Sequence, residues 1–401
     1  MNNSKDTQEK ISTLIEKGVS EILPSKKFLE SLLIQDKKLR IYAGFDPTGP
    51  TLHLGHTIQL RKLRHFQDLG HEIIFLIGDF TARIGDPTDK TAARKQLTEK
   101  EIKTNLKLYK KQAEKFISFS GRNGAKIKFN NDWLGKMKFA DVLELASHMT
   151  VDQMLKRDMF ARRIEEEKPI YIHEFMYPLM QGYDSVYMQV DGEVGGNDQL
   201  FNMLAGRTLL KQLKNKEKFV ITTKLLEDAN GKKMGKTEGN MVSLIDTPED
   251  MYGKIMSWTD GLMVPGFELC TDLSMGEIAD ITKELENGAH PRTIKMCLAY
   301  EITKSIHGEK SAQQAQDNFV SMFQKKEIPT DAQKINIQNK TLEEILIENN
   351  LLTSKGEVRR MLESGAIKNL STDTVLKNED AKSIPGQGVY KIGKAKFIEF
   401  V

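Results

Sequence analysis

The feature that most constrains the fold is the alternation of short apolar runs with amphipathic stretches between residues 39 and 226. Runs of strand length and composition cover residues 39–45, 72–79, 125–129, 185–190 and 218–222. Helical periodicity covers residues 57–69, 100–116, 139–149 and 199–213. Strands that alternate with helices form a parallel sheet with helices on both faces, and ligands bind beyond the carboxyl ends of its strands. We therefore predict an α/β fold with a ligand site at that edge.

The pattern changes after residue 228. Residues 247–323 are mainly helical in pattern, and a polar stretch over residues 325–339 indicates a linker. The last part of the chain predicts helices over 341–349 and 356–364, followed by short strands. We therefore predict an α/β domain over 1–228, a helical domain over 229–324, a linker over 325–339 and a small α+β domain over 340–401.

The composition narrows the class of protein. Hydrophobic residues make up 39% and charged residues 29% of the 401 residues, the balance of a globular chain. No apolar run approaches the ~20 residues that span a bilayer, and the N-terminus lacks the pattern of a secretory signal, so we expect a cytoplasmic protein. The net charge is only +3, so any RNA site must be a local cluster. Cys270 and Cys297 are expected to be buried thiols without a disulfide or zinc.

A helix start carries the first candidate site. A strand end and turn over residues 42–50 lead into Thr51-Leu52-His53-Leu54-Gly55-His56. The free N–H groups of a helix start attract anions, and His53 and His56 project from one face of the first turn. Gly55 lets a flat ring approach the backbone, so the segment suits a nucleotide whose phosphates lie against the histidines and Thr48. The alternative is a capped surface helix with two incidental histidines; zinc lacks a third ligand nearby.

A loop over residues 228–240 carries the second candidate site. It is rich in glycine and contains Lys232, Lys233 and Lys236. Such a loop can bring ammonium groups to a polyphosphate in the transition state of phosphoryl or nucleotidyl transfer. The alternative for this loop alone is a solvated basic turn.

Together, His-x-Gly-His after the first strand and Lys233-Met234-Gly235-Lys236-Thr237 after the last one resemble the signatures of class I aminoacyl-tRNA synthetases. The sequence departs from the commonest spelling at Leu54, Gly235 and Thr237, but both lysines are in place. The resemblance implies that residues 1–228 form a Rossmann-like catalytic domain. It also implies that 229–324 carry the lysine loop and an anticodon-side helical domain, and that 340–401 form an S4-like RNA-binding domain.

Further stretches resemble the bacterial tyrosine-specific branch of that family, tyrosyl-tRNA synthetase: residues 42–48, 84–88, 177–184 and 195–199. Tyr177, Gln181 and Asp184 fall on one helix stripe, where a buried carboxylate and amide would need partners. A packing face is the alternative. Glu193 stands where the better-known branch has Gln; it marks the other bacterial branch, and its contact stays open.

The resemblance implies a role for each matching residue. Tyrosine would contact Tyr42, Asp86, Tyr177, Gln181, Asp184 and Gln199, of which Tyr42 and Asp184 would bind the phenol hydroxyl. ATP would contact Asp46, Gly55, Asp198, Lys90 and Arg94. Charge on the pyrophosphate would be stabilised by Thr48, His53, Lys90, Arg94, Lys233, Lys236 and Thr237, and His56 would hold the ribose. The substrates would be L-tyrosine, ATP with Mg²⁺ and tRNA(Tyr), with no prosthetic group or protein-bound metal, and the enzyme would be a homodimer.

The RNA side is expected in the tail. Residues 353–367 resemble an S4 domain, although residues 341–401 contain nine basic and nine acidic residues. A local patch of Lys355, Arg359, Arg360 and Lys368 would then contact RNA; a solvated helix face is the alternative. A second basic cluster, residues 156–157 and 162–163, could lie near the acceptor stem or simply be solvated.

Three other classes compete with this interpretation. One is a related nucleotidyl transferase that adenylates another carboxylate without tRNA; the helical segment and the tail argue against it. Another is a tryptophanyl-tRNA synthetase, but Tyr42 with Asp184 fits a phenol better than an indole. The third is an inactive RNA-binding protein, against which the intact His53, His56, Lys233 and Lys236 argue.

Overall fold

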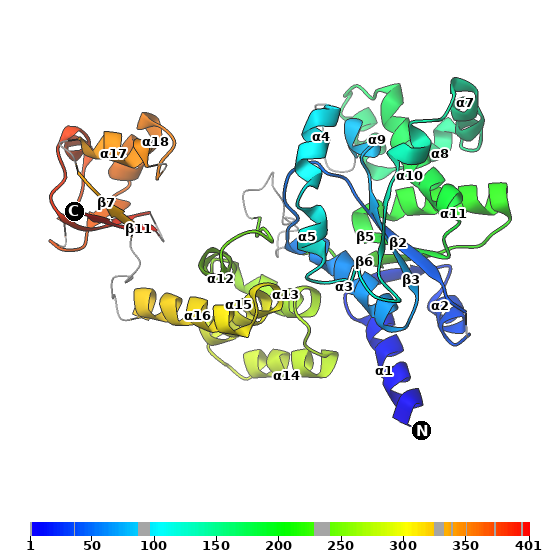
Figure 1. The fold of residues 1–401 in the computed structure, drawn as a ribbon, viewed down its shortest axis with the longest axis horizontal. Coiled ribbons are helices and arrows are strands. Elements are labelled where there is room, and N and C mark those ends of the chain that lie inside the picture. The colour runs from blue at the N-terminus through cyan, green and yellow to red at the C-terminus, as the bar shows by residue number, and fades with distance from the viewer. Residues whose placement is uncertain are drawn as a thin grey trace. The chain divides into compact units, whose positions relative to one another are not determined.

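A computed structural model describes residues 2–35, 37–86, 97–227, 241–324, 333–337, 340–349, 351–372, 374–393 and 396–401. The chain forms two compact units (Figure 1). The first comprises Met1–Thr247 and Lys254–Ile306, and the second comprises Pro248–Gly253 and His307–Val401. The predicted domain boundaries stay predictions. None of the described helices is long and apolar enough to cross a membrane.

The first unit contains a six-stranded sheet of order β1-β6-β5-β2-β3-β4. Its strands are β1 (Val19–Leu23), β2 (Arg40–Phe45), β3 (Glu72–Ile77), β4 (Lys126–Phe129), β5 (Gly192–Gly196) and β6 (Phe219–Thr223). All neighbours pair in parallel except β1, which pairs antiparallel with β6 at the edge. This confirms the predicted α/β fold with a parallel sheet, and four of the five predicted strands.

The predicted strand over residues 185–190 is wrong. Those residues continue helix α10 (Ile172–Met188) to its end, and the fifth parallel strand is β5, four residues further on. β5 has the sequence GEVGG, which carries almost no apolar signal. Its glycines are needed for space: a Cβ on Gly192 would come within 2.0 Å of the Phe219 ring. The glycines that β5 needs for its packing are therefore the same residues that hide the strand from a reading of the sequence.

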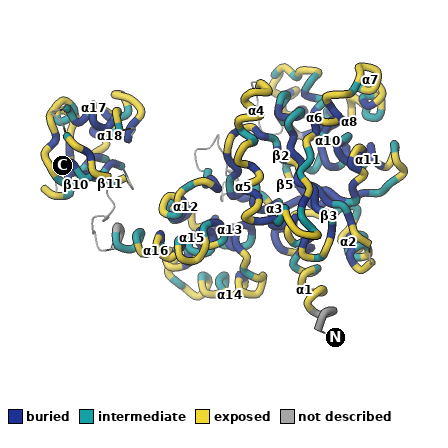
Figure 2. The backbone as a smooth tube through the Cα atoms, in the orientation of Figure 1, coloured by how far each residue is buried: buried dark blue, intermediate teal, exposed yellow. Residues whose placement is uncertain are grey.

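Helices cover both faces of the sheet, as predicted. Side chains alternate along a strand, so successive residues face opposite ways. Tyr42, with Ile74 and Leu76, packs against α10 in one buried cluster. On the other face, Phe66 of α3 (Leu54–Asp68) stacks on Phe219 at 5.7 Å. Figure 2 shows the strands between them as buried.

The first unit contains further helices. They are α1 (Asn2–Glu16), α2 (Lys26–Leu33), α4 (Glu99–Leu106), α5 (Tyr109–Ala113), α6 (Asn131–Leu134), α7 (Phe139–Ser147), α8 (Val151–Leu155), α9 (Asp158–Glu165), α11 (Leu200–Lys214), α13 (Met263–Cys270), α14 (Met275–Glu286) and α15 (Pro291–His307). The helix expected over 100–116 is therefore two, α4 and α5. Helix α12 (Pro248–Met256) has residues in both units.

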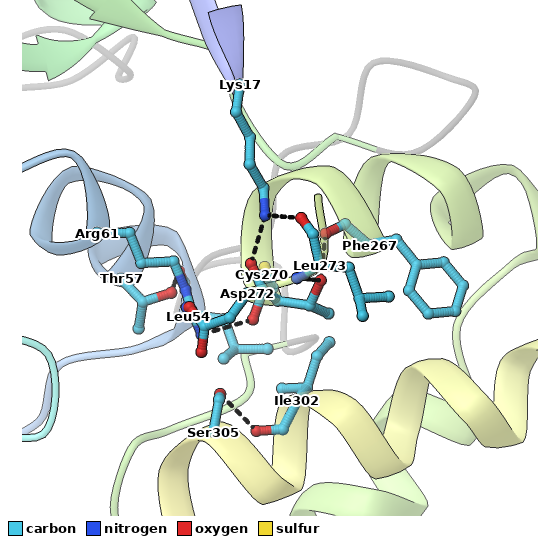
Figure 3. Close-up of polar contacts among 11 residues, drawn as sticks. Lys17, Leu54, Thr57, Arg61, Phe267, Cys270, Asp272, Leu273, Ile302 and Ser305 are labelled. Carbon is cyan, nitrogen blue, oxygen red and sulfur yellow. Dashed lines mark hydrogen bonds and ion pairs between the residues drawn. The ribbon is translucent and has the colours of Figure 1, made fainter. Parts of the chain in front are cut away.

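Two buried cations, Arg61 of α3 and Lys17 of the segment between α1 and β1, bind the carboxyl end of α13 (Figure 3). Lys17 Nζ donates 2.8 Å to the carbonyl of Thr271, and Arg61 donates 2.9 Å to the carbonyl of Cys270 while pairing with Asp272. Cations at the carboxyl end of a helix satisfy its last carbonyls and favour its dipole. Helix α3, which begins at the candidate anion site, is therefore held in place by its contact with the end of α13.

The two cysteines differ in exposure. Cys270 is buried, as expected, but Cys297 is exposed, because it lies on the outer face of α15. Its burial was wrongly predicted.

The second unit contains α16 (Glu309–Gln324) and a five-stranded sheet of order β7-β11-β10-β8-β9. The strands are β7 (Gln333–Ile335), β8 (Ile367–Asn369), β9 (Thr374–Val375), β10 (Gly388–Ile392) and β11 (Lys396–Phe400); the helices are α17 (Leu342–Glu348) and α18 (Lys355–Glu363). The predicted helix–turn–helix followed by strands is confirmed. β7, however, lies inside the stretch expected to be a linker, where it pairs in parallel with β11.

Candidate active site

The candidate site lies where the strand order of the sheet reverses. The chain runs outward from β2 through β3 to β4, and then returns to the other side of β2 to form β5 and β6. Loops that leave β2 and β5 therefore diverge, and open sheets of this kind bind ligands in the crevice between them. Asp46 follows β2 directly, and Asp198 follows β5 by two residues.

The two histidines cap the first turn of α3. His53 is the N-cap residue, and its Nδ1 accepts a 3.1 Å hydrogen bond from Gly55 N; His56 Nδ1 accepts one of 3.1 Å from His53 N. A neutral imidazole that accepts at Nδ1 carries its proton at Nε2. Both rings can therefore donate from Nε2 to an oxygen of a ligand. A Cβ on Gly55 would be 3.0 Å from the His53 ring, so the ring would have to shift.

A distant segment pairs with this helix start. Leu54 N donates to Val242 O at 3.1 Å, and Leu244 N donates to Leu52 O at 3.0 Å. Residues 241–244 directly follow the predicted lysine loop, 228–240, which lies outside the described residues. The carboxyl side of that loop is therefore fixed beside the histidines.

Helices α4 and α5 hold the turn between β2 and α3. Tyr109 donates 2.8 Å from its hydroxyl to Gly49 O, and Asn105 donates 2.8 Å to Pro47 O. Gln112 accepts 2.7 Å from Leu52 N. Side chains about 60 residues away thus satisfy the backbone of the turn that carries Thr48, which is itself exposed.

Asp46 is held by two hydroxyls. Thr81 donates to its Oδ1 and Tyr177 to its Oδ2, each at 2.8 Å. The carboxylate also requires Gly78, since a Cβ there would lie 1.9 Å from Asp46 Oδ1. Asp46 is therefore rigidly placed at the mouth of the crevice.

Asp184 is a buried carboxylate of helix α10. It is 2% exposed and accepts from Trp133 Nε1 at 2.8 Å and from Asn130 Nδ2 at 3.3 Å. Burial raises the pKa of Asp184 well above its usual value, while the two N–H donors favour the charged form. The predicted need for partners is met. This carboxylate can still accept a proton-bearing group of a ligand, since each oxygen has two lone pairs.

Three carboxylates surround Tyr177. Burial first, then the charges of Asp46, Asp86 and Asp184, raise the pKa of its hydroxyl well above the usual value. The predicted helix stripe Tyr177, Gln181 and Asp184 lies on α10 as expected. A group of carboxylates attracts a cation, so this part of the site suits an ammonium group.

Asp86 and Gln199 lie together. Gln199 Nε2 donates 2.5 Å to Asp86 Oδ2, and Arg157 Nη2 pairs with Asp86 Oδ1 at 3.0 Å. Arg157 is only 5% exposed, and Arg163 is buried in an ion pair with Glu174. The expected surface cluster at 156–157 and 162–163 is therefore wrong for these two arginines, which partner buried carboxylates.

Several residues predicted to contact substrates lie outside the described residues, and the predicted RNA-binding residues lie in the second unit. Lys90, Arg94, Lys233, Lys236 and Thr237 lie outside the described residues. The RNA candidates belong to the second unit: Lys355 pairs with Glu343, Arg359 with Glu363, and Lys368 lies opposite Lys391 across β8 and β10. All site assignments stay predictions.

Sequence reasoning missed the residues that hold the site. These are Gly78, Thr81, Asn130, Trp133, Ser185 and Lys218. Only Glu193 had drawn attention, by its unusual identity. Within the described residues, no group of three or more His, Cys, Asp or Glu could hold a metal ion.

The comparisons with known proteins agree with this geometry. The family model described as tRNA synthetases class I (W and Y) matches residues 35–324, so the chain belongs to that family. The curated relatives are tyrosine–tRNA ligases. That of Thermotoga maritima is 41% identical over 394 residues, covering 98% of this chain and 97% of the relative. Tyrosine–tRNA ligase 2 of Vibrio cholerae is 43% identical over 387 residues, covering 96% of each.

Solved structures share the fold. A C-terminally truncated mitochondrial tyrosyl-tRNA synthetase of Coccidioides posadasii matches with a TM-score of 0.62 at 28% identity, over 79% of this chain and 93% of that chain. A tyrosyl-tRNA synthetase of Archaeoglobus fulgidus in complex with L-tyrosine matches with a TM-score of 0.63 at 23% identity, over 78% and 100%.

Proposed function

We propose that the chain is a tyrosine–tRNA ligase, which activates tyrosine with ATP and transfers it to the 3′-terminal adenosine of tRNA(Tyr). The observation that carries this proposal is the buried pair of Asp184 and Tyr42, with two further carboxylates, Asp46 and Asp86, near Tyr177 on the same site. A phenol hydroxyl fits the first feature and an α-ammonium fits the second. Full-length similarity to tyrosine–tRNA ligases supports the same substrate.

The activation step is an in-line displacement. A carboxylate oxygen of tyrosine attacks the α-phosphorus of Mg-ATP, a new P–O bond forms, and the bond to the β-phosphate oxygen breaks. Pyrophosphate leaves with the negative charge, and no proton is transferred. The protein therefore needs no nucleophile or general base and acts by position and charge stabilisation.

The helix start would stabilise the phosphates and ribose. His53 and His56 carry protons at Nε2, which suits donation to phosphate and hydroxyl oxygens. Thr48 and the N-terminus of α3 act on the same side. Asp198 would accept from the ribose, and Asp46 lies close to the sugar.

The lysine loop would complete this cradle. Residues 242–244 pair with residues 52–54, which supports a position of Lys233, Lys236 and Thr237 over the departing pyrophosphate. Lys90 and Arg94 would stabilise the same pyrophosphate charge. In the second step, a ribose hydroxyl of the terminal adenosine attacks the adenylate carbonyl carbon and forms an ester. The bond from that carbon to the phosphate oxygen breaks, and AMP and the hydroxyl proton leave.

A homodimer is supported by an exposed apolar surface. Of the fifteen exposed large hydrophobic side chains among the described residues, seven fall between residues 139 and 187: Phe139, Leu143, Val151, Ile164, Tyr171, Ile172 and Tyr187. Exposed apolar side chains are typical of a protein interface where they gather on one face. We expect a cytoplasmic dimer that binds RNA through the tail of each subunit.

ATP–pyrophosphate exchange with each of the twenty amino acids tests the proposal. Exchange with tyrosine, and aminoacylation of tRNA(Tyr), are the expected results. Exchange with tryptophan in place of tyrosine would refute the specificity, and exchange with no amino acid would refute the activity.

A further inference from the structure

A row of buried polar groups lies behind Tyr42, and none of the roles above uses it. Lys218, just before β6, is fully buried and forms an ion pair with Glu193 of β5. Lys218 Nζ also lies 2.8 Å from Ser185 Oγ of α10. That same oxygen is 2.9 Å from the hydroxyl of Tyr42. A continuous chain of contacts therefore runs from the ion pair to the pocket.

The row is enclosed by helix α11. A Cβ on Gly206 would be 2.8 Å from Lys218 Nζ and 2.9 Å from Ser185 Oγ. The backbone of α11 therefore closes over both groups. Burial lowers the pKa of Lys218, whereas the charges of Glu193 and Asp184 favour its protonated form. An ammonium retained in such a place must direct its protons to the few acceptors around it.

The direction of the hydrogen bonds follows from the chemistry of the two ends. An ammonium group only donates, so Ser185 Oγ accepts from Lys218. Ser185 then has one proton, which faces the Tyr42 oxygen at 2.9 Å and the Glu193 Oε2 at 3.5 Å. The shorter contact is the stronger hydrogen bond. With the Ser185 proton in this shorter contact, Tyr42 accepts from Ser185, and its own proton points away from Ser185.

We propose that Lys218, held by Glu193 and acting through Ser185, is a positioning residue that makes the Tyr42 hydroxyl a hydrogen-bond donor toward the amino-acid pocket. This inference rests on the proposed function. A substrate phenol has one proton, which it gives to Asp184, and its oxygen then receives the proton of Tyr42. This direction of the hydrogen bonds suits a substrate ring that bears a hydroxyl. With phenylalanine, the Tyr42 donor would be left unpaired.

The other carboxylate oxygen of Glu193 has a different partner, and its loss should have a different effect on specificity. Glu193 Oε1 accepts 3.0 Å from Gln181 Nε2, and the family resemblance assigns Gln181 to the α-ammonium of the substrate. Every amino acid has that ammonium. Loss of Glu193 should therefore weaken tyrosine and phenylalanine together, whereas loss of Lys218 or Ser185 should weaken tyrosine alone.

The experiment is ATP–pyrophosphate exchange with tyrosine and with phenylalanine. Ser185→Ala keeps the ion pair, and Lys218→Met removes its cation. We expect each to lower the tyrosine-to-phenylalanine ratio of kcat/KM about tenfold, the loss of one neutral hydrogen bond, with the phenylalanine value unchanged. In a Tyr42→Phe background, Ser185→Ala should change the ratio no further, because the chain acts through that hydroxyl.

The matched control is Lys62→Met. Lys62 is another buried lysine, 2% exposed, whose Nζ donates to backbone carbonyls of Leu14 and Lys17. It should destabilise the fold and leave the ratio unchanged. An unchanged ratio in Ser185→Ala, or an equal fall in the Tyr42→Phe background, would overturn the inference. Absence of tyrosine-dependent exchange in the wild type would instead overturn the proposed function.

Discussion

The hydroxyl of Tyr177 donates a 2.8 Å hydrogen bond to Asp46 Oδ2, which joins the middle of α10 to the carboxyl end of β2. The two residues are 131 positions apart in the chain. One comes from the stripe assigned to the amino acid and the other from the turn assigned to ATP. The contact therefore links the two predicted substrate sites.

Tyr177→Phe removes this link while keeping the ring. Asp46 retains only the hydroxyl of Thr81 of its two donors, and the loss of a hydrogen bond to a charged group costs about 1.5–3 kcal/mol. We expect KM for tyrosine in pyrophosphate exchange to rise at least tenfold. Tyr183→Phe, on the same helix, is the control and should leave KM unchanged. Equal effects in the two variants would contradict the assigned role.

Asp184→Asn tests the buried end of the pocket. The variant replaces a carboxylate that accepts from Trp133 and Asn130 with an amide whose NH₂ group must face one of those donors or the ligand. We expect kcat/KM for tyrosine to fall ~10- to 100-fold, the equivalent of one charged hydrogen bond, while the phenylalanine value changes little. Steady-state exchange kinetics measure both. A variant that still prefers tyrosine as strongly as the wild type would exclude Asp184 from the phenol contact.

Gly78→Ala tests the seat of Asp46. The new methyl group would lie 1.9 Å from Asp46 Oδ1 and 2.4 Å from Thr81 Oγ1, so the carboxylate must move. We expect a loss of about 1–3 kcal/mol in the free energy of unfolding, together with reduced exchange activity. Gly253→Ala in α12, where no atom lies within 4 Å, should be neutral or stabilising. Urea unfolding compares the stabilities of the two variants. Equal free energies of unfolding would show that Asp46 is not tightly held against Gly78.

The buried lysines make stability depend on pH. Burial lowers the pKa of Lys62 to about 7, and burial together with the charge of Arg61 lowers that of Lys17 to about 8. Because the unfolded chain holds these protons up to about pH 10.4, it binds more protons than the folded chain above pH 7. The contribution of Lys62 to stability should therefore rise from pH 7 to 10, by up to about 1.4 kcal/mol per pH unit.

Urea unfolding of the wild type and of Lys62→Met between pH 6.5 and 9.5 isolates the contribution of Lys62 to the free energy of unfolding. The difference in unfolding free energy between the two proteins should change steadily with pH in favour of the wild type. A difference that stays constant over this range would show that Lys62 keeps its proton in the fold.

The tail should act on RNA alone. Lys355 and Arg359 are already paired with glutamates, so among the four RNA candidates we expect Arg360 on α18 to matter most. Arg360→Ala should raise KM for tRNA(Tyr) in aminoacylation, with a weaker salt dependence, and leave pyrophosphate exchange unchanged. A change in exchange would indicate that the variant disturbs the catalytic unit instead.

The sequence predicted the strands of this fold where a run of apolar residues marked them, and failed where it did not. The runs over 39–45 and 72–79 are aliphatic and bounded by turn residues, so their strands were predicted within two residues. β5 was missed because its glycines serve the packing of Phe219 and Met203, a requirement that exists only in the folded state. Apolar residues of α10 near 185–190 then took its place in the prediction.

For the site, the sequence located the residues that face the crevice but not those behind them. His53 and Gly55 form a local motif at a helix start, and such motifs can be recognised from spacing. The partner of Asp86 is Arg157, 71 residues away, and that of Asp184 is Trp133, 51 residues away. Pairings of this kind depend on how helices pack, and periodicity along one helix carries no information about them.

The antiparallel edge strand β1 has a practical consequence. It lies outside residues 35–324, the range that the family model matches, yet its backbone pairs with that of β6 from Val19↔Thr223 to Leu23↔Val220. A chain trimmed to the matching range would expose the edge of a wholly buried, β-branched strand, a template for pairing with other molecules. Such a truncation should aggregate during expression, even though every residue assigned to catalysis is still present.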